Sequence, residues 1–188
     1  MLVQRMLRAA RLDPEVYYEL ERDRSANGQA FLVVLLVLAC GILGTAGITG
    51  LLYFLTPMGW GPLIEILAMT IGNWLFWTYI AVLVGARYGS RADFEQVMRP
   101  VGFAATPGLL WLLAFIPGLA LPIGGVVLIW TCVARIVAVR ESMRLTLGKA
   151  VLTAVVTTVI IWVINVVMAF VMGGSTSLVR IILSPLGR

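Results

Sequence analysis

The sequence contains few side chains that could carry out catalysis or hold a metal ion. It has no histidine, so the most common general base and metal ligand is missing. Its two cysteines, Cys40 and Cys132, each lie inside an apolar run, where we expect them to pack as small hydrophobic side chains. The motifs H-E-x-x-H and G-x-S-x-G and the phosphate-binding loop are absent. The sequence therefore predicts no catalytic residue, no metal ligand and no cofactor, and indicates a protein that is not an enzyme.

The composition is typical of a protein embedded in a membrane. Of the 188 residues, 61% are hydrophobic and only 12% are charged, whereas a globular protein carries roughly 25% charged residues. The net charge of +5 comes almost entirely from arginine, since Lys149 is the only lysine. Because these basic residues flank apolar runs, we expect them to contact lipid headgroups, and we predict no binding of nucleic acid.

Apolar runs long enough to cross a bilayer recur along the chain. The uncharged run 101–134 would be about 51 Å long as one helix, well beyond the ~30 Å hydrocarbon core. Pro117, Gly118 and Pro122 divide it into two short spans. The sequence thus predicts an all-α polytopic membrane protein with a cytosolic segment 1–29, a transmembrane domain 30–172 and an external tail 173–188. The five predicted spans are 30–55, 63–86, 101–116, 121–139 and 150–172.

The basic residues also predict the orientation. The N-terminal segment holds five Lys/Arg residues, the central loop three and the loop after the fourth span four, whereas the two opposite loops hold none. Cytosolic loops carry the excess of Lys and Arg in membrane proteins. We therefore expect the N-terminus inside, the C-terminus outside and five crossings.

Two short helices are predicted in the N-terminal segment. In residues 1–12 an apolar face lies opposite the arginines, so this helix is expected either in the headgroup plane or against the protein's own cytosolic loops. Asp13 and Pro14 then form a typical helix start, with Asp13 at the N-cap. This second helix carries Tyr17 and Tyr18 and is predicted to lie on the cytosolic face.

Several residues inside the spans are predicted to guide helix packing. Glycines at every third position of the first span would let a neighbouring helix approach closely, within the chain or in a dimer. Two amides at similar depth in spans two and five predict a contact between these spans. Glu65, the only acid inside a span, is expected to pair with Arg180 or to be solvated at the outer interface. The packing residues are Gly41, Gly44, Gly47, Gly50, Asn73 and Asn165.

The charged segment between spans two and three could bind a protein partner. Charged residues cannot lie in hydrocarbon cheaply, so we expect this segment in water, next to the Tyr17/Tyr18 helix. The residues predicted to dock a partner are Tyr17, Tyr18, Arg91, Asp93, Glu95 and Arg99. An ordinary solvated loop is the alternative.

Three stretches resemble bacterial members of the Yip family, which are five-span relatives of the membrane proteins that interact with Ypt/Rab GTPases. These stretches are DPEVYYELE (13–21), GFAATP (102–107) and WTCVARIVAVRESMRLTLGKA (130–150). Gly102, Phe103 and Pro107 resemble the glycine–tyrosine–proline motif of that family, with phenylalanine in place of tyrosine, whereas the eukaryotic D-L-Y-G-P motif is missing.

The resemblance implies a non-enzymatic membrane scaffold or organiser, integral to the bacterial inner membrane. Such a protein would contact membrane lipids and bind protein partners or a second copy of itself, or would shape the bilayer. Two alternatives remain from the sequence, an accessory subunit of a larger membrane complex and a small-solute transporter.

Overall fold

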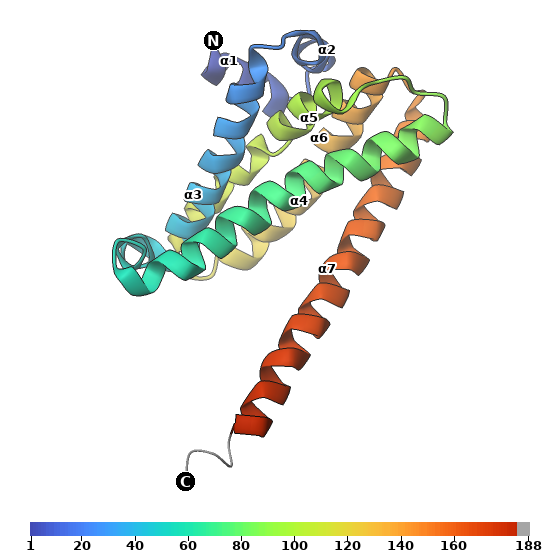
Figure 1. Cartoon of the computed structure of the whole chain (residues 1–188). Coiled ribbons are helices and arrows are strands. Elements are labelled where there is room, and N and C mark those ends of the chain that lie inside the picture. Colours follow the sequence, from blue (N-terminus) through green and yellow to red (C-terminus); the bar gives the residue numbers. More distant parts are fainter. Residues whose placement is uncertain (184–188) are drawn as a thin grey trace.

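The computed structural model describes the backbone of residues 1–183 and the side chains of residues 1–168 and Phe170, and every regular element in this part of the chain is a helix (Figure 1). Five segments are long and apolar enough to cross a membrane: Ala26–Tyr53, Pro57–Arg87, Phe94–Phe115, Ala120–Met143 and Leu147–Met168. The elements are α1 (Leu2–Ala10), α2 (Pro14–Arg22), α3 (Ala26–Tyr53), η1 (Pro57–Gly59), α4 (Trp60–Arg87), α5 (Phe94–Phe103), η2 (Thr106–Phe115), α6 (Ala120–Met143) and α7 (Leu147–Leu183).

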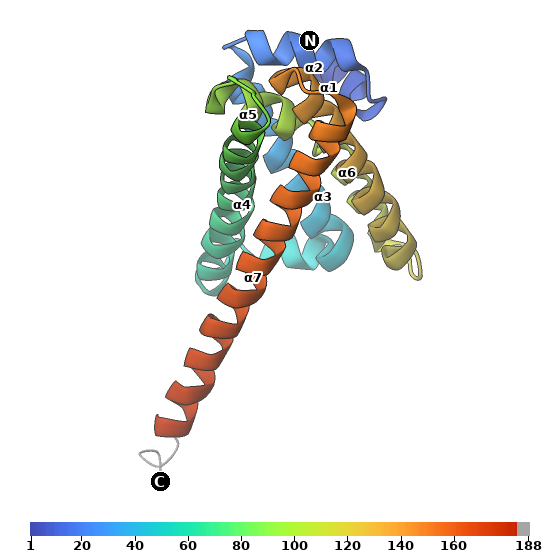
Figure 2. The ribbon, with the colours of Figure 1, turned by 90° about the vertical axis from the view of Figure 1, so that its right-hand side faces the viewer.

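The short helices gather at one end of the molecule. Figures 1 and 2 show α1, α2 and α5 at the end where the N-terminus lies, together with the last turns of α4 and α6 and the first turn of α7. The turn at η1 lies at the opposite end (Figure 1). The long helices therefore cross between a capped end and an end with short turns.

The best-packed core lies beneath this capped end. Tyr17 and Phe103 are fully buried and Trp77 is 2% exposed. By contrast, many apolar side chains farther along the long helices are exposed, such as Leu128 at 65% and Trp162 at 67%. Apolar surface of this extent is unfavourable in water but is satisfied by lipid tails, because the hydrocarbon core of a bilayer is itself apolar.

The third span differs from the predicted helix 101–116. The apolar helical segment begins earlier, with α5 at Phe94, and the part that follows α5 into the span, Thr106–Phe115, is a 3₁₀ helix. Pro107 occupies the start of this 3₁₀ segment, where its missing N–H has no cost. Because a 3₁₀ helix rises about 2.0 Å per residue instead of 1.5 Å, a short segment covers more of the bilayer thickness.

The glycines of α3 do not form a single groove. Gly44 is buried, and a Cβ built there would overlap the carbonyl oxygen of Trp111 in η2. Gly41 has open space around it. Gly47 has φ 63° and ψ −164° and breaks the helical path, which requires glycine because side chains disfavour such a backbone conformation. The predicted continuous span 30–55 is therefore kinked, and of these three glycines Gly44 is the one against which η2 packs.

Two further boundaries move relative to the prediction. Arg135, Arg140 and Glu141 lie in α6 and not in a loop, because the helix continues to Met143. At the other end of the chain, α7 continues through Gly173 and Gly174 to Leu183, where the sequence predicted the external tail to begin. A glycine costs only about 1 kcal/mol in a helix interior, so two glycines do not have to end a long apolar helix.

Candidate functional site

The capped end, which we call the charged cap, consists of α1, α2, α5 and the connections 11–13, 23–25, 88–93 and 144–146. Its first two helices are joined by a buried hydrogen bond, in which the Tyr17 hydroxyl donates to the carbonyl of Ala9 at 2.9 Å. Ion pairs at 2.7 Å link Arg8 to Asp13 and Arg5 to Asp23. The charged cap is thus a folded unit and not a set of loose loops.

The start of α2 follows the local rules for a helix N-terminus. Asp13 is the N-cap and accepts a hydrogen bond from the backbone N–H of Glu15 at 3.0 Å, and Pro14 follows it. The hydrogen bond from Arg8, the first of several favourable contacts, holds the pKa of the Asp13 carboxyl below its ordinary value. Hydrogen bonds from Ser25 and then from Arg5 lower the pKa of Asp23 in the same way.

Arg99 lies in the interior of the charged cap, with its side chain 3% exposed. Its Nη1 donates to the backbone carbonyl of Glu21 at 2.6 Å, its Nε to Asn27 Oδ1, and its Nη2 to Glu95 Oε2 at 3.2 Å. The prediction that Arg99 lies in a solvated loop, available to a partner, is therefore wrong. The reason is that carbonyl, amide and carboxylate acceptors replace water around the buried guanidinium.

The two tyrosines of α2 have different roles. Tyr17 is fully buried, so it cannot belong to a docking surface, contrary to the sequence-based expectation. Tyr18 is 40% exposed, and its ring lies between the guanidinium groups of Arg22 at 5.5 Å and Arg144 at 5.9 Å. Tyr18 therefore lies on the surface of the charged cap between two cations.

Of the remaining residues predicted to dock a partner, Arg91, Asp93 and Glu95 are exposed. Asp93 is the N-cap of α5, and its backbone N–H donates to Gln96 Oε1 at 2.9 Å. Glu95 forms the outer side of the ion pair with Arg99. Helix α5 thus begins inside the charged segment, and its first turn presents acidic side chains on the cap surface.

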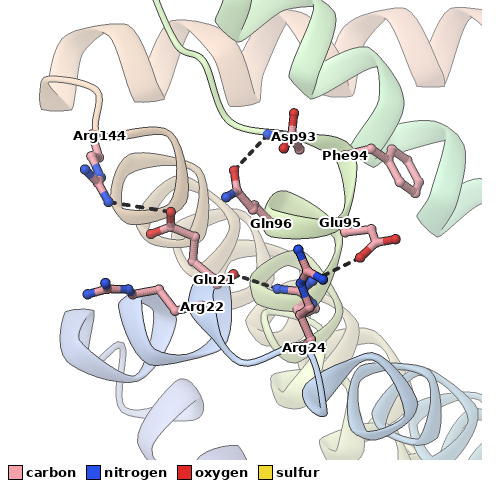
Figure 3. A pocket seen from close by; sticks show the side chains of 9 residues that line it. Glu21, Arg22, Arg24, Asp93, Phe94, Glu95, Gln96 and Arg144 are labelled. Atoms are coloured by element: carbon pink, nitrogen blue, oxygen red, sulfur yellow. Dashed lines mark hydrogen bonds and ion pairs between the residues drawn. The ribbon is translucent and has the colours of Figure 1, made fainter.

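A groove is present on the charged cap where α2 ends, α5 begins and α6 ends (Figure 3). Its volume is about 650 Å³. We call it the Glu21 groove, because the buried carboxylate of Glu21 lies in its wall and faces Arg144 (Figure 3). Its lining includes Glu21, Arg22, Arg24, Asp93, Gln96 and Arg144. Glu21 and Arg144 have no recognisable signal in the sequence, because they lie 123 residues apart and come together only in the folded chain.

The glycine–phenylalanine–proline motif lies directly beneath the charged cap. A Cβ at Gly102 would come within 2.9 Å of Ala30 in α3 and 3.0 Å of the ring of Trp74 in α4. Phe103 is fully buried, and Pro107 is buried at the start of η2. The motif therefore brings α5 against two other helices and turns the chain into the third span.

A cation also lies within the bundle, at Arg135 of α6. Its guanidinium carbon lies 4.9 Å from the centre of the Trp77 ring, and Trp77 Nε1 donates to the hydroxyl of Thr158 in α7 at 3.3 Å. A cation over a tryptophan face is attracted by the negative ring surface. The contact joins α4, α6 and α7, and the sequence signal for it was an arginine within a mainly apolar segment.

The two amides in the spans lie close together. Asn165 Nδ2 donates to Asn73 Oδ1 at 3.4 Å and to the carbonyl of Ile161 at 2.7 Å. Both amides line a groove of about 630 Å³ between α4 and α7, whose lining also includes Glu65 and Met168. The expected partner of Glu65, Arg180, has a side chain that lies outside the described residues.

The candidate site thus has the properties of a binding surface. Residues 1–168 contain no group of three or more acidic or cysteine side chains arranged to hold a metal ion. The charged cap combines fixed backbone geometry with exposed arginines, acids and one tyrosine. Such a surface can bind a partner or a charged ligand through ion pairs and aromatic contacts.

Comparison with known proteins identifies one family. The family model named Yip1 domain matches residues 12–170, which include α2 to α6 and most of α7. No curated protein and no solved structure matches the chain.

Proposed function

This chain belongs to the Yip1 domain family, as an integral membrane protein of the Yip type, and we propose that it is a non-enzymatic scaffold whose charged cap binds protein partners. In this proposal the N-terminus lies in the cytosol, the chain crosses the membrane five times and residues 173–188 lie outside. The membrane is the inner membrane of a bacterium. The distribution of Lys and Arg between the two ends supports this orientation.

The observation that carries the proposal is the rigid construction of the charged cap. Arg99 is held by three acceptors and is itself buried, so it joins the end of α2 and the start of α3 to α5 beneath the surface that carries Tyr18. A fixed surface loses little conformational entropy on binding. Tyrosine and arginine are also the residue types that contribute most often to the energy of protein interfaces.

The cap also suits a role in shaping the bilayer. Met6 and Ala9 of α1 pack on the protein, whereas Val3 and Leu7 are 66% and 54% exposed. Trp130 of α6 donates to the carbonyl of Ala10 at 2.8 Å, which connects the end of α1 to a spanning helix. In this position Val3 and Leu7 would enter the headgroup region of one leaflet.

Cross-linking in cells followed by affinity purification tests the scaffold proposal. Partners bound through the charged cap should be recovered with the unmodified chain and lost, by at least fivefold, from the double variant Tyr18→Ala/Arg91→Ala. The matched control is Met58→Ala, since Met58 is 82% exposed at the opposite end. Equal recovery from the double variant and the control would contradict docking at the cap.

The groove between α4 and α7 favours a second candidate, an accessory subunit of a larger membrane complex. The groove is lined by Met69, Phe76 and Met168 beside the two amides. A transmembrane helix of another protein could pack against this surface. A photo-cross-linker placed at Phe76 should then capture a membrane protein, whereas one placed at Leu128 on α6 should capture only lipid. Capture of lipid alone at both positions would exclude this candidate.

A further inference from the structure

The carboxylate of Glu21 is buried without adequate partners. The residue is 6% exposed, and its Oε2 has no hydrogen-bond donor within the described part of the chain. Its Oε1 lies 3.7 Å from Arg144 Nη2, which is an ion pair too long to be a hydrogen bond. Leaving a buried carboxylate without a donor is costly, so the site is suited to a ligand that brings N–H groups.

Space for such a ligand exists on both sides of this carboxylate. Glu21, Gln96 and Arg144 line the Glu21 groove and also a neighbouring cavity of about 400 Å³. Pockets of a few hundred cubic ångströms accommodate small ligands. Gln96 uses its Oε1 to accept the N–H of Asp93, so its amide N–H groups remain available as further donors.

The lining of the same space also carries arginines that can bind an anion, beside the acids Asp93 and Glu95. Arg22 and Arg24 line the Glu21 groove, and Arg91 lines the neighbouring cavity. Arg22 contacts the ring and hydroxyl of Tyr18, and no ion pair joins Arg24 or Arg91 to an acid among the described side chains. Guanidinium groups bind phosphate strongly, often through two parallel hydrogen bonds.

Few ligand groups satisfy both halves of this site. A ligand with phosphate alone would satisfy the arginines but leave Glu21 without a donor. A cation alone would satisfy Glu21 but not the arginines. A phosphate joined by two carbons to an ammonium supplies both an anion for the arginines and three N–H donors for the carboxylate.

We propose that the Glu21 groove binds a phosphoethanolamine group, with the ammonium hydrogen-bonded to Glu21 and the phosphate held by Arg144 and the other arginines of the lining. The ammonium then donates to Glu21 Oε2, which has no donor within the described part of the chain, and Arg144 becomes a ligand of the phosphate. A phosphocholine group fits less well, because its quaternary nitrogen carries no N–H donor.

The phosphoethanolamine group could belong to a membrane lipid or to a soluble molecule. The groove lies at the end of the spanning helices, where α5 begins and α6 ends, which is the level at which lipid headgroups are expected. This inference rests on the proposed function only in assigning the charged cap to the membrane surface. Headgroup binding needs no protein partner, so it would remain even if the cross-linking experiment recovered no partner. Conversely, a protein that does not bind the headgroup could still act as a scaffold.

The first experiment measures binding of soluble headgroups to the purified full-length protein by calorimetry in a detergent that contains no phosphate. Glycerophosphoethanolamine should bind at least tenfold more tightly than glycerophosphocholine and than inorganic phosphate. Glu21→Gln should remove this preference, whereas Glu15→Gln on the same helix should keep it, because the Glu15 side chain is 87% exposed. Equal binding of the two headgroups by the unmodified protein would overturn the proposal.

A second experiment identifies the source of the phosphoethanolamine group, and a second variant keeps the test valid if Glu21→Gln does not fold. The protein is reconstituted in nanodiscs of phosphatidylethanolamine or phosphatidylcholine, and retained lipid is counted by native mass spectrometry. Retention of phosphatidylethanolamine but not of phosphatidylcholine would assign the site to a lipid. Binding of glycerophosphoethanolamine without retention of either lipid would assign it to a soluble molecule. If Glu21→Gln does not fold, Arg24→Gln in the groove lining should weaken ethanolamine headgroup binding at least threefold. Absence of binding in both experiments would refute the site.

Discussion

Arg99 Nη1 donates a hydrogen bond of 2.6 Å to the backbone carbonyl of Glu21, a residue 78 positions earlier in the chain. The same guanidinium also contacts Asn27 at the start of α3. One buried side chain therefore connects α5, which leads into the third span, to α2 and to the first span. This connection explains how a short charged segment can hold a defined shape at the membrane surface.

Replacing Arg99 should destabilise the protein much more than replacing an exposed arginine. Arg99→Ala leaves the Glu21 carbonyl and the Asn27 amide without their donor, which is expected to cost about 2–3 kcal/mol. For a chain of this size that corresponds to a fall in melting temperature of roughly 5–10 °C. Scanning fluorimetry in detergent measures it, with exposed Arg91→Ala as the control. Equal melting of the two variants would contradict the buried role of Arg99.

The glycines of α3 should differ in their tolerance of a methyl group. At Gly44 a Cβ would overlap the Trp111 carbonyl, whereas at Gly41 it would meet nothing within 4 Å. Gly44→Ala should therefore push η2 away from α3 and cost about 1–3 kcal/mol, as overpacking commonly does. Gly41→Ala should leave the melting temperature unchanged or raise it slightly. If the two substitutions had the same effect, the close contact between α3 and η2 would be wrong.

The proximity of Asn73 and Asn165 can be tested by disulfide formation. In a background without Cys40 and Cys132, the double variant Asn73→Cys/Asn165→Cys should cross-link under mild oxidant, because the two side chains meet at 3.4 Å. Asn73→Cys/Trp162→Cys is the control pair, since Trp162 is 67% exposed. Asn73→Ala alone should change stability little, as hydrogen bonds between membrane helices average about 0.6 kcal/mol. Failure of the first pair to cross-link would contradict the contact between Asn73 and Asn165.

Attachment of α1 to the charged cap should weaken in acid. The pKa values of Asp13 and Asp23 are lowered in the folded protein from an ordinary value of 3.8, so both carboxylates stabilise the fold above about pH 4. That stabilisation is lost as the pH falls below 3.8 and through the lower folded values. A spin label at Gln4, which is exposed, should be ordered at pH 7 and more mobile at pH 3.

The double variant Asp13→Asn/Asp23→Asn supplies the control for this acid effect. It removes the charge of both carboxylates at every pH, so the label should already be mobile at pH 7 and change little on acidification. A label that is equally ordered at pH 7 and pH 3 in the unmodified protein would show that these ion pairs do not hold α1.

The sequence predicted the class of protein and the number of apolar segments well. All-helical structure and five segments able to cross a membrane follow from hydropathy and from the division of the run 101–134 at Pro117 and Pro122. The prediction that Arg99 is exposed failed, because groups far away in the sequence replace water as its hydrogen-bond partners. Arg99 was expected in solvent because a single sequence cannot reveal the acceptors that Glu21 and Asn27 provide.

The details of the third span and of the candidate groove were also beyond sequence reasoning. Hydropathy does not distinguish a 3₁₀ helix from an α-helix, so the longer rise of Thr106–Phe115 could not be anticipated. The Glu21 groove depends on Glu21, Asp93 and Arg144, which come from three helix ends. Charge counting identified this end of the molecule as important but could not place its residues around a single buried carboxylate.

Sidedness of the charged cap is tested most directly by cysteine labelling in intact cells. Single cysteines at Ser25 and Ser90 in the charged cap and at Met58 in η1 are introduced into a background without Cys40 and Cys132. We expect an impermeant maleimide to modify Met58→Cys at once, and to modify Ser25→Cys and Ser90→Cys only after the membrane is permeabilised. Labelling of either serine position in intact cells, or protection of Met58→Cys, would contradict a cytosolic cap above five spanning segments.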